Sequence, residues 1–205
     1  MIKNFLFDFG GVLCDLDFEG CMKSFAAIGF PAEKMTEETV FSGIFQQMNI
    51  GTISDEAFWE GLRQLGHVQA SDDTLRAIWN SIIVGVPAHR FQALKQLGRE
   101  YPLYMLSNVN NPHWEYCRQH VFDCEGECLT DLFRQLFLSY RMHKEKPNSD
   151  IFKQVLDETG LNAAETLFID DRADNIATAS AMGFATLQAL GDEWIVWMKS
   201  HGFLK

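Results

Sequence analysis

The stretch that decides the fold is Phe5-Leu6-Phe7-Asp8-Phe9-Gly10-Gly11, close to the N-terminus. It opens with three apolar residues, which is typical of a short strand buried in a parallel sheet. The run ends at Asp8, and the two glycines that follow let the backbone turn and approach a ligand closely. The sequence therefore predicts a buried strand whose C-terminal end projects the carboxylate of Asp8.

Two later segments repeat this pattern. Apolar runs at 103–106 and 166–169 each end in a polar pair, Ser107-Asn108 and Asp170-Asp171 respectively. Open α/β sheets bind ligands at the carboxyl ends of their strands. We therefore expect three strand ends to meet at one site.

Helical patterns separate these strands, at 88–97, 149–158 and 175–182, and Gly183 follows the last one as a C-terminal cap would. Alternating strands and helices indicate a parallel sheet. The sequence therefore predicts an α/β fold.

Residues 18–85 are the exception, because they hold helix-like stretches rich in Phe, Met and Trp and no convincing strand. Ser54 and Ser71 are typical N-terminal caps, and they open helical patterns that run to Leu65 and Ile82. We predict a core formed by residues 1–17 and 86–205, with a helical cap inserted at 18–85.

Composition and charge exclude several classes of function. The chain is 47% hydrophobic and 22% charged, as in ordinary globular proteins, and its formal net charge is -11. Nucleic acids and anionic membranes normally require a basic patch, so we expect neither as a partner. The N-terminus lacks the pattern of a signal peptide, and the five cysteines lack the spacing of a disulfide framework. We expect a cytoplasmic protein with reduced thiols.

The polar residues at the strand ends fit phosphate chemistry. A carboxylate that attacks phosphorus needs a metal to offset the phosphate charge, donors for the phosphate oxygens and a nearby cation. Asp8 is a candidate nucleophile, and Asp170-Asp171 are candidate ligands for Mg²⁺, which favours one or two carboxylates. Ser107-Asn108 offer a hydroxyl and backbone N–H groups, and Lys146 offers the cation.

Four motifs in this order resemble those of the haloacid dehalogenase superfamily, and they span nearly the whole chain: Phe7-Asp8-Phe9-Gly10-Gly11-Val12-Leu13, Leu106-Ser107-Asn108, Lys146-Pro147 and Phe168-Ile169-Asp170-Asp171. Within it, three further stretches are similar to the small bacterial sugar-phosphate phosphatases typified by α-D-glucose-1-phosphate phosphatase. These stretches are Asp15-Leu16-Asp17-Phe18, residues 51–58 and residues 170–175.

The resemblance implies a Rossmann-like core with a helical cap and a small phosphorylated metabolite as substrate. It also implies an aspartyl-phosphate intermediate at Asp8. The Mg²⁺ would be held by Asp8, by the main-chain oxygen of Gly10 and by one aspartate of the last motif. The phosphate would be held by Ser107, Asn108 and Lys146, and Lys146 would also act in catalysis.

Either acid of the last motif could be the metal ligand. In this family a glycine ends the following helix at a set distance from the ligand, and counting back from Gly183 gives Asp171. The resemblance then places Asp170 and Asn175 beside the metal ligands, with Asp170 as a partner of Lys146.

Gly10 departs from the family pattern, because most phosphatases of the superfamily carry there a second aspartate that serves as general acid and base. Two alternatives therefore stay open beside the phosphatase. One is a catalytically weak or silent domain that binds phosphorylated ligands or a protein. The other is a 2-haloacid dehalogenase, which also lacks this aspartate but needs no metal.

The sequence assigns no role to several further residues. Asp15 and Asp17 are as well explained by loop or capping roles as by substrate contacts. His143 lies close to Lys146 in the sequence, and the segment 113–128 holds cysteines and histidines but no Cys-x-x-Cys zinc knuckle. The aromatic residues Phe58, Trp59 and Trp79 fit a cap core better than a stacking platform for substrate.

Overall fold

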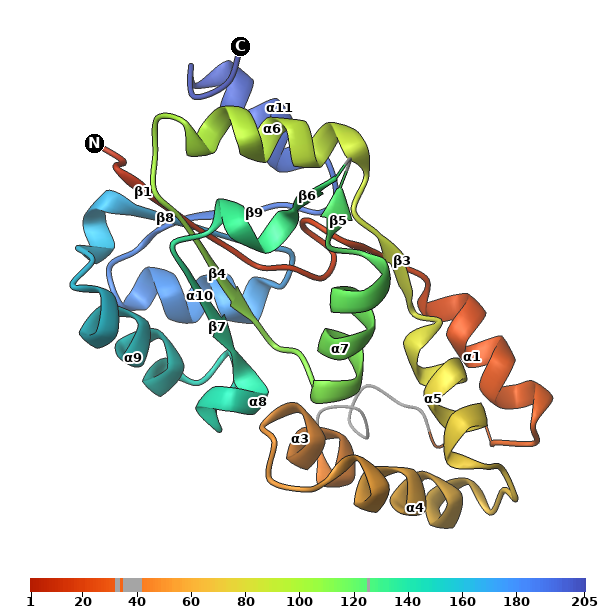
Figure 1. Cartoon of the computed structure of the whole chain (residues 1–205). Helices are drawn as coiled ribbons and strands as arrows, with labels where there is room; N and C mark the ends of the chain where they lie inside the picture. The colour runs from red at the N-terminus through yellow and green to blue at the C-terminus, as the bar shows by residue number, and fades with distance from the viewer. Residues whose placement is uncertain (32–33, 35–41, 125) are drawn as a thin grey trace.

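A five-stranded parallel sheet forms the centre of the core in the computed structural model, which describes residues 1–31, 34, 42–124 and 126–205 (Figure 1). The strand order is β7-β4-β1-β8-β9. The strands are β1 (Asn4–Phe7), β4 (Leu103–Ser107), β7 (Gln135–Leu138), β8 (Thr166–Asp170) and β9 (Ala185–Gln188). All four pairings are parallel, so the predicted parallel α/β sheet is confirmed.

Helices cover both faces of this sheet. Successive residues of a strand point to opposite faces, so Phe5 and Phe7 of β1 pack into one apolar cluster and Leu6 packs into another. The first cluster includes residues of α6 (Ala88–Gly98), α7 (Asn111–His120) and α11 (Glu193–Ser200). The second includes residues of α9 (Ser149–Thr159) and α10 (Ala173–Ala181). This double cover explains why the strands read as continuous apolar runs.

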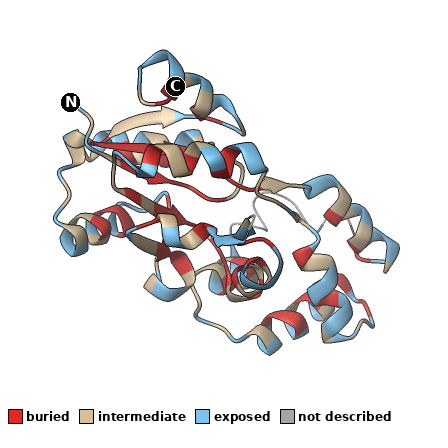
Figure 2. Ribbon diagram, turned by 45° about the horizontal axis from the view of Figure 1, so that its top comes forward, coloured by how far each residue is buried: buried red, intermediate tan, exposed pale blue. Residues whose placement is uncertain are grey.

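The helical cap has an apolar core of its own. Its helices are α1 (Phe18–Ala27), α3 (Gly43–Asn49), α4 (Asp55–Gly66) and α5 (Asp72–Asn80). Their buried side chains, including the fully buried Phe58 and Trp59, form a cluster drawn from residues 21–82 alone. Figure 2 shows buried residues on the inward faces of these helices as well as in the sheet. The predicted helical cap is therefore present.

The cap joins the core through two short antiparallel strands, β2 (Asp15–Leu16) and β3 (Ile83–Gly85). The prediction that no strand lies within residues 18–85 is wrong at this end. The α5 helix begins after Ser71, whose hydroxyl accepts the Thr74 N–H, but it ends at Asn80 because the chain then turns into β3. The boundaries at 18 and 85 stay a prediction, and residues 32–33 and 35–41 of the predicted cap lie outside the described residues.

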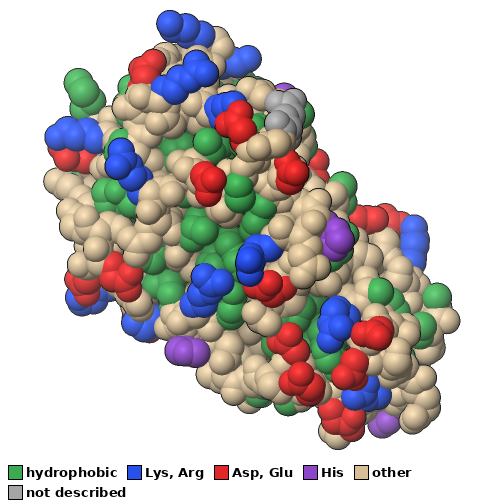
Figure 3. Space-filling model, in the orientation of Figure 1, with side chains coloured by type: hydrophobic (Ala, Val, Ile, Leu, Met, Phe, Trp, Pro, Cys, Tyr) green, Lys and Arg blue, Asp and Glu red, His purple; other side chains and the backbone are tan. Residues whose placement is uncertain are grey.

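The remaining elements are short: β5 (Asp123–Cys124), β6 (Glu127–Cys128), the 3₁₀ turns η2 (Leu129–Leu132) and η3 (Ala163–Glu165), and α8 (Ser139–Met142). None of the described helices has the length and apolar character that crossing a membrane requires. On the face drawn in Figure 3, acidic and basic side chains are interspersed rather than gathered by sign.

Candidate active site

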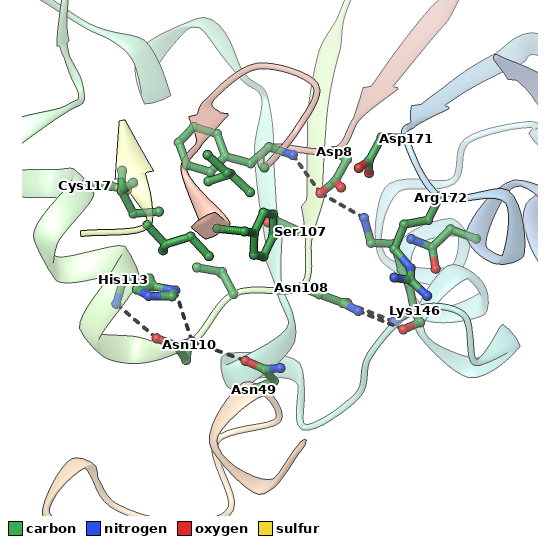
Figure 4. A pocket seen from close by; sticks show the side chains of 18 of the residues that line it. Asp8, Asn49, Ser107, Asn108, Asn110, His113, Cys117, Lys146, Asp171 and Arg172 are labelled. Carbon is green, nitrogen blue, oxygen red and sulfur yellow. Dashed lines mark hydrogen bonds and ion pairs between the residues drawn. The ribbon is translucent and has the colours of Figure 1, made fainter. Parts of the chain in front are cut away.

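The sheet order brings the predicted site residues together. Strands β4, β1 and β8 are neighbours, so their C-terminal ends place Ser107, Asp8 and the pair Asp170-Asp171 at one edge. Lys146 reaches the same edge from the loop that precedes α9. Asp8, Ser107, Lys146 and Asp171 line a cavity of about 360 Å³ (Figure 4).

The ammonium group of Lys146 is buried against two aspartates. Its Nζ lies 2.6 Å from Oδ2 of Asp170 and 2.9 Å from Oδ1 of Asp8, and it donates to the carbonyl oxygen of Leu106 at 2.9 Å. Burial opposes the charge, but the two carboxylates outweigh it and hold the pKa of Lys146 above its usual value. All three N–H groups of this amine have acceptors, so its position is fixed.

Asp8 keeps one carboxylate oxygen available. Its Oδ1 accepts the Phe9 N–H at 2.7 Å and faces Lys146. In the part of the chain that the structure describes, no donor reaches its Oδ2. Burial raises the pKa of Asp8 to about 7, although Lys146 acts in the opposite direction. The oxygen without a donor is thus free to react or to bind a cation.

Both oxygens of Asp170 are already occupied. Oδ1 accepts the backbone N–H of Arg172 at 2.9 Å and the Asn175 amide at 2.9 Å, while Oδ2 accepts Lys146 and the same Asn175 amide at 3.0 Å. The residue is completely buried. Asp170 is therefore placed to anchor Lys146 rather than to face the cavity.

Asp171 lies closer to solvent and packs against the glycine loop. A Cβ atom built on Gly11 would lie only 2.7 Å from Oδ2 of Asp171, and the backbone of Gly11 has a φ of +77°. Both facts make a side chain at Gly11 unfavourable. Burial, followed by the charge of Asp170, raises the pKa of Asp171 above its usual value.

The three carboxylates form a group suited to a cation. Oxygens of Asp8, Asp170 and Asp171 all lie within 4.8 Å of one another, and no other group of three or more metal-binding side chains occurs among the described residues. Three carboxylates face one ammonium group, which leaves an excess of negative charge in a largely buried site. A hard divalent cation such as Mg²⁺, which takes oxygen ligands, fits this charge and donor set. Because the oxygens of Asp170 are occupied, Asp8 and Asp171 are the carboxylates left for it.

The side chains of Ser107 and Asn108 have different roles. The Asn108 amide oxygen accepts the Lys146 N–H at 2.9 Å, and the Asn108 amide nitrogen donates to the Lys146 carbonyl at 2.8 Å. This side chain therefore holds the loop that carries Lys146 and leaves only the backbone N–H of Asn108 for a ligand. The side chain of Ser107 lines the cavity at the end of β4.

Asp15, Asp17 and His143, to which the sequence assigned no role, do not line the cavity. Asp17 caps α1 by accepting the Gly20 N–H at 2.8 Å, and Asp15 pairs with the buried Arg90 at 2.6 Å. His143 is exposed and lies 2.9 Å from the carbonyl oxygen of Ile50 in the cap. These residues shape the cap and its attachment to the core.

One wall of the cavity consists of residues that were not predicted from the sequence as site residues. Asn49 and Trp79 of the cap and Asn110 and His113 of the core line it, together with apolar residues such as Leu16. Asn110 caps α7, which the sequence could have indicated, but a capping asparagine gives no sign of a binding site. Trp79 packs against the cap core and also faces the cavity.

A comparison with protein-family models matches residues 2–183 to the haloacid dehalogenase-like hydrolases. The chain belongs to this family. The match covers the cap and all four motifs, so the resemblance predicted from the sequence is confirmed and the chain is a hydrolase.

The chain is similar over most of its length to a known enzyme and to solved structures. A D-ribitol-5-phosphate phosphatase of Bacteroides thetaiotaomicron is 31% identical over 95% of both chains. The crystal structure of a haloacid dehalogenase family enzyme from the same organism, in complex with magnesium and inorganic phosphate, matches with a TM-score of 0.84. It is 37% identical and covers 91% of this chain and 93% of that one. An L-2-haloacid dehalogenase of Xanthobacter autotrophicus matches at 19% identity with a TM-score of 0.62, covering 100% of this chain and 85% of that one, a likeness of fold alone.

Proposed function

We propose that this hydrolase is a Mg²⁺-dependent phosphatase that acts on a small phosphorylated sugar or polyol through an aspartyl phosphate at Asp8. One observation carries the proposal: Asp8 has one oxygen that accepts no hydrogen bond, its other oxygen faces the fixed ammonium of Lys146, and its carboxylate is grouped with that of Asp171. A relative that hydrolyses D-ribitol 5-phosphate and a structural neighbour that binds magnesium and phosphate support it.

In the proposed reaction an oxygen of Asp8 attacks phosphorus and the bond between phosphorus and the substrate alcohol breaks. Water then hydrolyses the aspartyl phosphate, which releases inorganic phosphate and restores Asp8. Asp8, Asp171 and the main-chain oxygen of Gly10 would hold Mg²⁺. When bound, the ion offsets the negative charge of the phosphate.

The neighbouring residues would act around this centre. Ser107 would donate its hydroxyl, and Asn108 its backbone N–H, to phosphate oxygens. Lys146 would stabilise the charge near the nucleophile, because its amine is held on Asp8 by Asp170. Asn175 would act through Asp170, to which it donates from one amide nitrogen.

No acid stands at position 10 to protonate the departing alcohol. His113 is the titratable cavity residue nearest in type to a general acid, but its Nε2 lies 3.0 Å from the carbonyl oxygen of Trp79 and its Nδ1 lies 3.2 Å from the Asn110 amide nitrogen. Burial also lowers the pKa of His113 to about 4, so the ring is neutral at pH 7. We infer that water protonates the leaving group.

The two alternatives make different demands on the site. A dehalogenase needs no metal, and the excess negative charge around Asp8 would repel a haloacid carboxylate unless a cation were bound. A silent binding domain would need neither an uncovered oxygen on Asp8 nor a fixed amine beside it. The geometry thus favours the phosphatase.

Purified protein should release inorganic phosphate from D-ribitol 5-phosphate, glucose 1-phosphate or p-nitrophenyl phosphate when Mg²⁺ is present and not after chelation. Asp8→Asn protein purified in parallel controls for contaminating phosphatases. Halide release from 2-haloacids without phosphate release would establish the dehalogenase, and no release from any ester would leave the silent domain.

A further inference from the structure

The orientation of the Asn110 side chain is fixed by two groups that can only donate. Its Oδ1 lies 3.3 Å from Nε1 of Trp79 and 3.1 Å from the backbone N–H of His113. An indole N–H and a backbone N–H have no acceptor atom, so the oxygen of the Asn110 amide must face both. The Asn110 amide nitrogen therefore points the other way.

That nitrogen has two hydrogens and two acceptors. It lies 3.2 Å from Nδ1 of His113 and 3.2 Å from Oδ1 of Asn49. His113 can accept at Nδ1 because its proton sits on Nε2, where it is donated to the Trp79 carbonyl. Asn110 is 2% exposed, so it cannot turn over without leaving donors facing donors in a buried site.

The orientation of the Asn49 amide follows from that of Asn110. Since Asn110 donates to it, Asn49 must turn its oxygen to Asn110 and its Nδ2 away. No acceptor for this Nδ2 occurs among residues 1–31, 34, 42–124 and 126–205. Asn49 is partly exposed and lines the cavity, and the Ser139 hydroxyl lies 2.6 Å from its carbonyl oxygen. An amide donor is thus held rigidly at the cavity wall without a partner.

This donor is remote from the phosphate chemistry. Figure 4 shows Asn49 and Asn110 on the opposite side of the cavity from Asp8 and Asp171. A ligand whose phosphorus lies beside Asp8 would direct its alcohol portion, and not its phosphate, toward Asn49.

We propose that Asn49 is a specificity-determining residue whose Nδ2 donates a hydrogen bond to a hydroxyl oxygen on the alcohol portion of the substrate. The inference rests on the proposed phosphatase function and narrows it. Substrates would be phosphate monoesters of polyhydroxylated alcohols, and simple alkyl phosphates of the same length would be poor substrates. A substrate without a hydroxyl group would leave the Asn49 donor without an acceptor. A site built to bind a hydroxyl group discriminates in this way against substrates that lack one.

The test compares D-ribitol 5-phosphate with n-pentyl phosphate, which has the same chain length and no hydroxyl groups. Asn49→Asp keeps an oxygen for Asn110 but offers no donor, and Asn49→Ala removes the side chain. Both variants should lower the ratio of kcat/KM for the ribitol ester to that for the pentyl ester by about tenfold, the loss of one net hydrogen bond. Gln46→Leu is a matched control, since Gln46 lies on the same helix α3 and bonds Glu145 at 2.7 Å without lining the cavity.

The outcomes separate the inference from the function on which it rests. If the Asn49 variants lose activity equally on both esters, or as the Gln46 control does, Asn49 only positions the cap and the inference is overturned. A wild-type enzyme that already turns over the two esters equally overturns it as well. If the wild type releases no phosphate from these esters or from p-nitrophenyl phosphate, the proposed function fails, and the inference fails with it.

Discussion

Lys146 Nζ lies 2.6 Å from Oδ2 of Asp170, and neither side chain is more than 1% exposed. The ion pair links the end of β8 to the loop before α9 and holds the amine against Asp8. Removing one partner of a buried pair leaves an uncompensated charge, which typically costs about 3–5 kcal/mol. Replacing Asp170 should therefore affect different properties of the protein from replacing Asp171.

We expect Asp171→Asn to raise the Mg²⁺ concentration for half-maximal activity more than Asp170→Asn does, because Asp171 keeps an oxygen for the ion. Asp170→Asn should instead lower the free energy of unfolding through the loss of the Lys146 pair, by less than the ~3–5 kcal/mol of a buried charge left with no partner, because Asp8 still faces the amine. A Mg²⁺ titration of activity and a urea melt measure the two effects. The reverse order in the titration would mean that Asp170 is the ligand.

Asp8→Asn should reduce turnover by more than about a thousandfold, as expected when a nucleophile is removed. The variant should fold, because the substitution changes little volume and because burial, which raises the pKa of Asp8 to about 7, favours a neutral group there. Phosphate release from p-nitrophenyl phosphate and the circular dichroism spectrum test the two parts. Covalent catalysis by Asp8 is wrong if a folded variant, free of contaminating phosphatase, keeps a few per cent of wild-type turnover.

Mg²⁺ binding should weaken as the pH falls. A metal-binding carboxylate must be deprotonated, and Asp8, with its pKa raised to about 7, is increasingly protonated below that pH. The raised pKa of Asp171 acts in the same direction. Calorimetric titrations at pH 6 and pH 8 should give a weaker apparent affinity at pH 6 for the wild type. Affinity that does not change between these pH values would mean that protons do not compete at these carboxylates.

The absence of an acid at Gly10 should make the enzyme selective for good leaving groups. General acids contribute about 10²–10⁴ in rate, and they matter most for alcohols that leave poorly as anions. We expect higher turnover on p-nitrophenyl phosphate, acyl phosphates and anomeric sugar 1-phosphates than on glycerol phosphate. Turnover that does not vary with the acidity of the leaving group would show that a side chain of the protein protonates the departing alcohol.

Gly10→Asp should then accelerate hydrolysis of the alkyl phosphates selectively. The sequence alone leaves open a positive φ at Gly10, but among the described glycines of this loop it is Gly11 that has one, at +77°. An added Cβ at Gly10 would meet only the Leu16 side chain, at 3.1 Å from its Cδ1, which can shift. The variant should be shown to fold and to bind Mg²⁺, and equal rates on both classes of ester would count against an acid role at this position.

Much of the fold could be predicted from the sequence, because its signals are local. The apolar runs before Asp8, Ser107 and Asp170, with helical patterns between them, determined a parallel sheet and the edge at which its polar residues meet. The four ordered motifs indicated the family, which the comparison confirms. The strand at Ile83–Gly85 was missed because three residues carry little periodic signal and pair only with a strand far away in the chain.

The division of roles within the site was decided by the tertiary structure. Counting from Gly183 favoured Asp171 as a metal ligand, but only the packing reveals that both oxygens of Asp170 are occupied and that Asn108 clamps the Lys146 loop. The free donor of Asn49 depends on Asn110, 61 residues away, and on two further groups that set the Asn110 amide. The direction of each hydrogen bond depends on groups that lie far apart in the sequence. Local sequence patterns therefore cannot predict which amide donor stays free. The sequence alone determined which chemical groups the chain carries to the sheet edge, and the fold decided which of their atoms stay free.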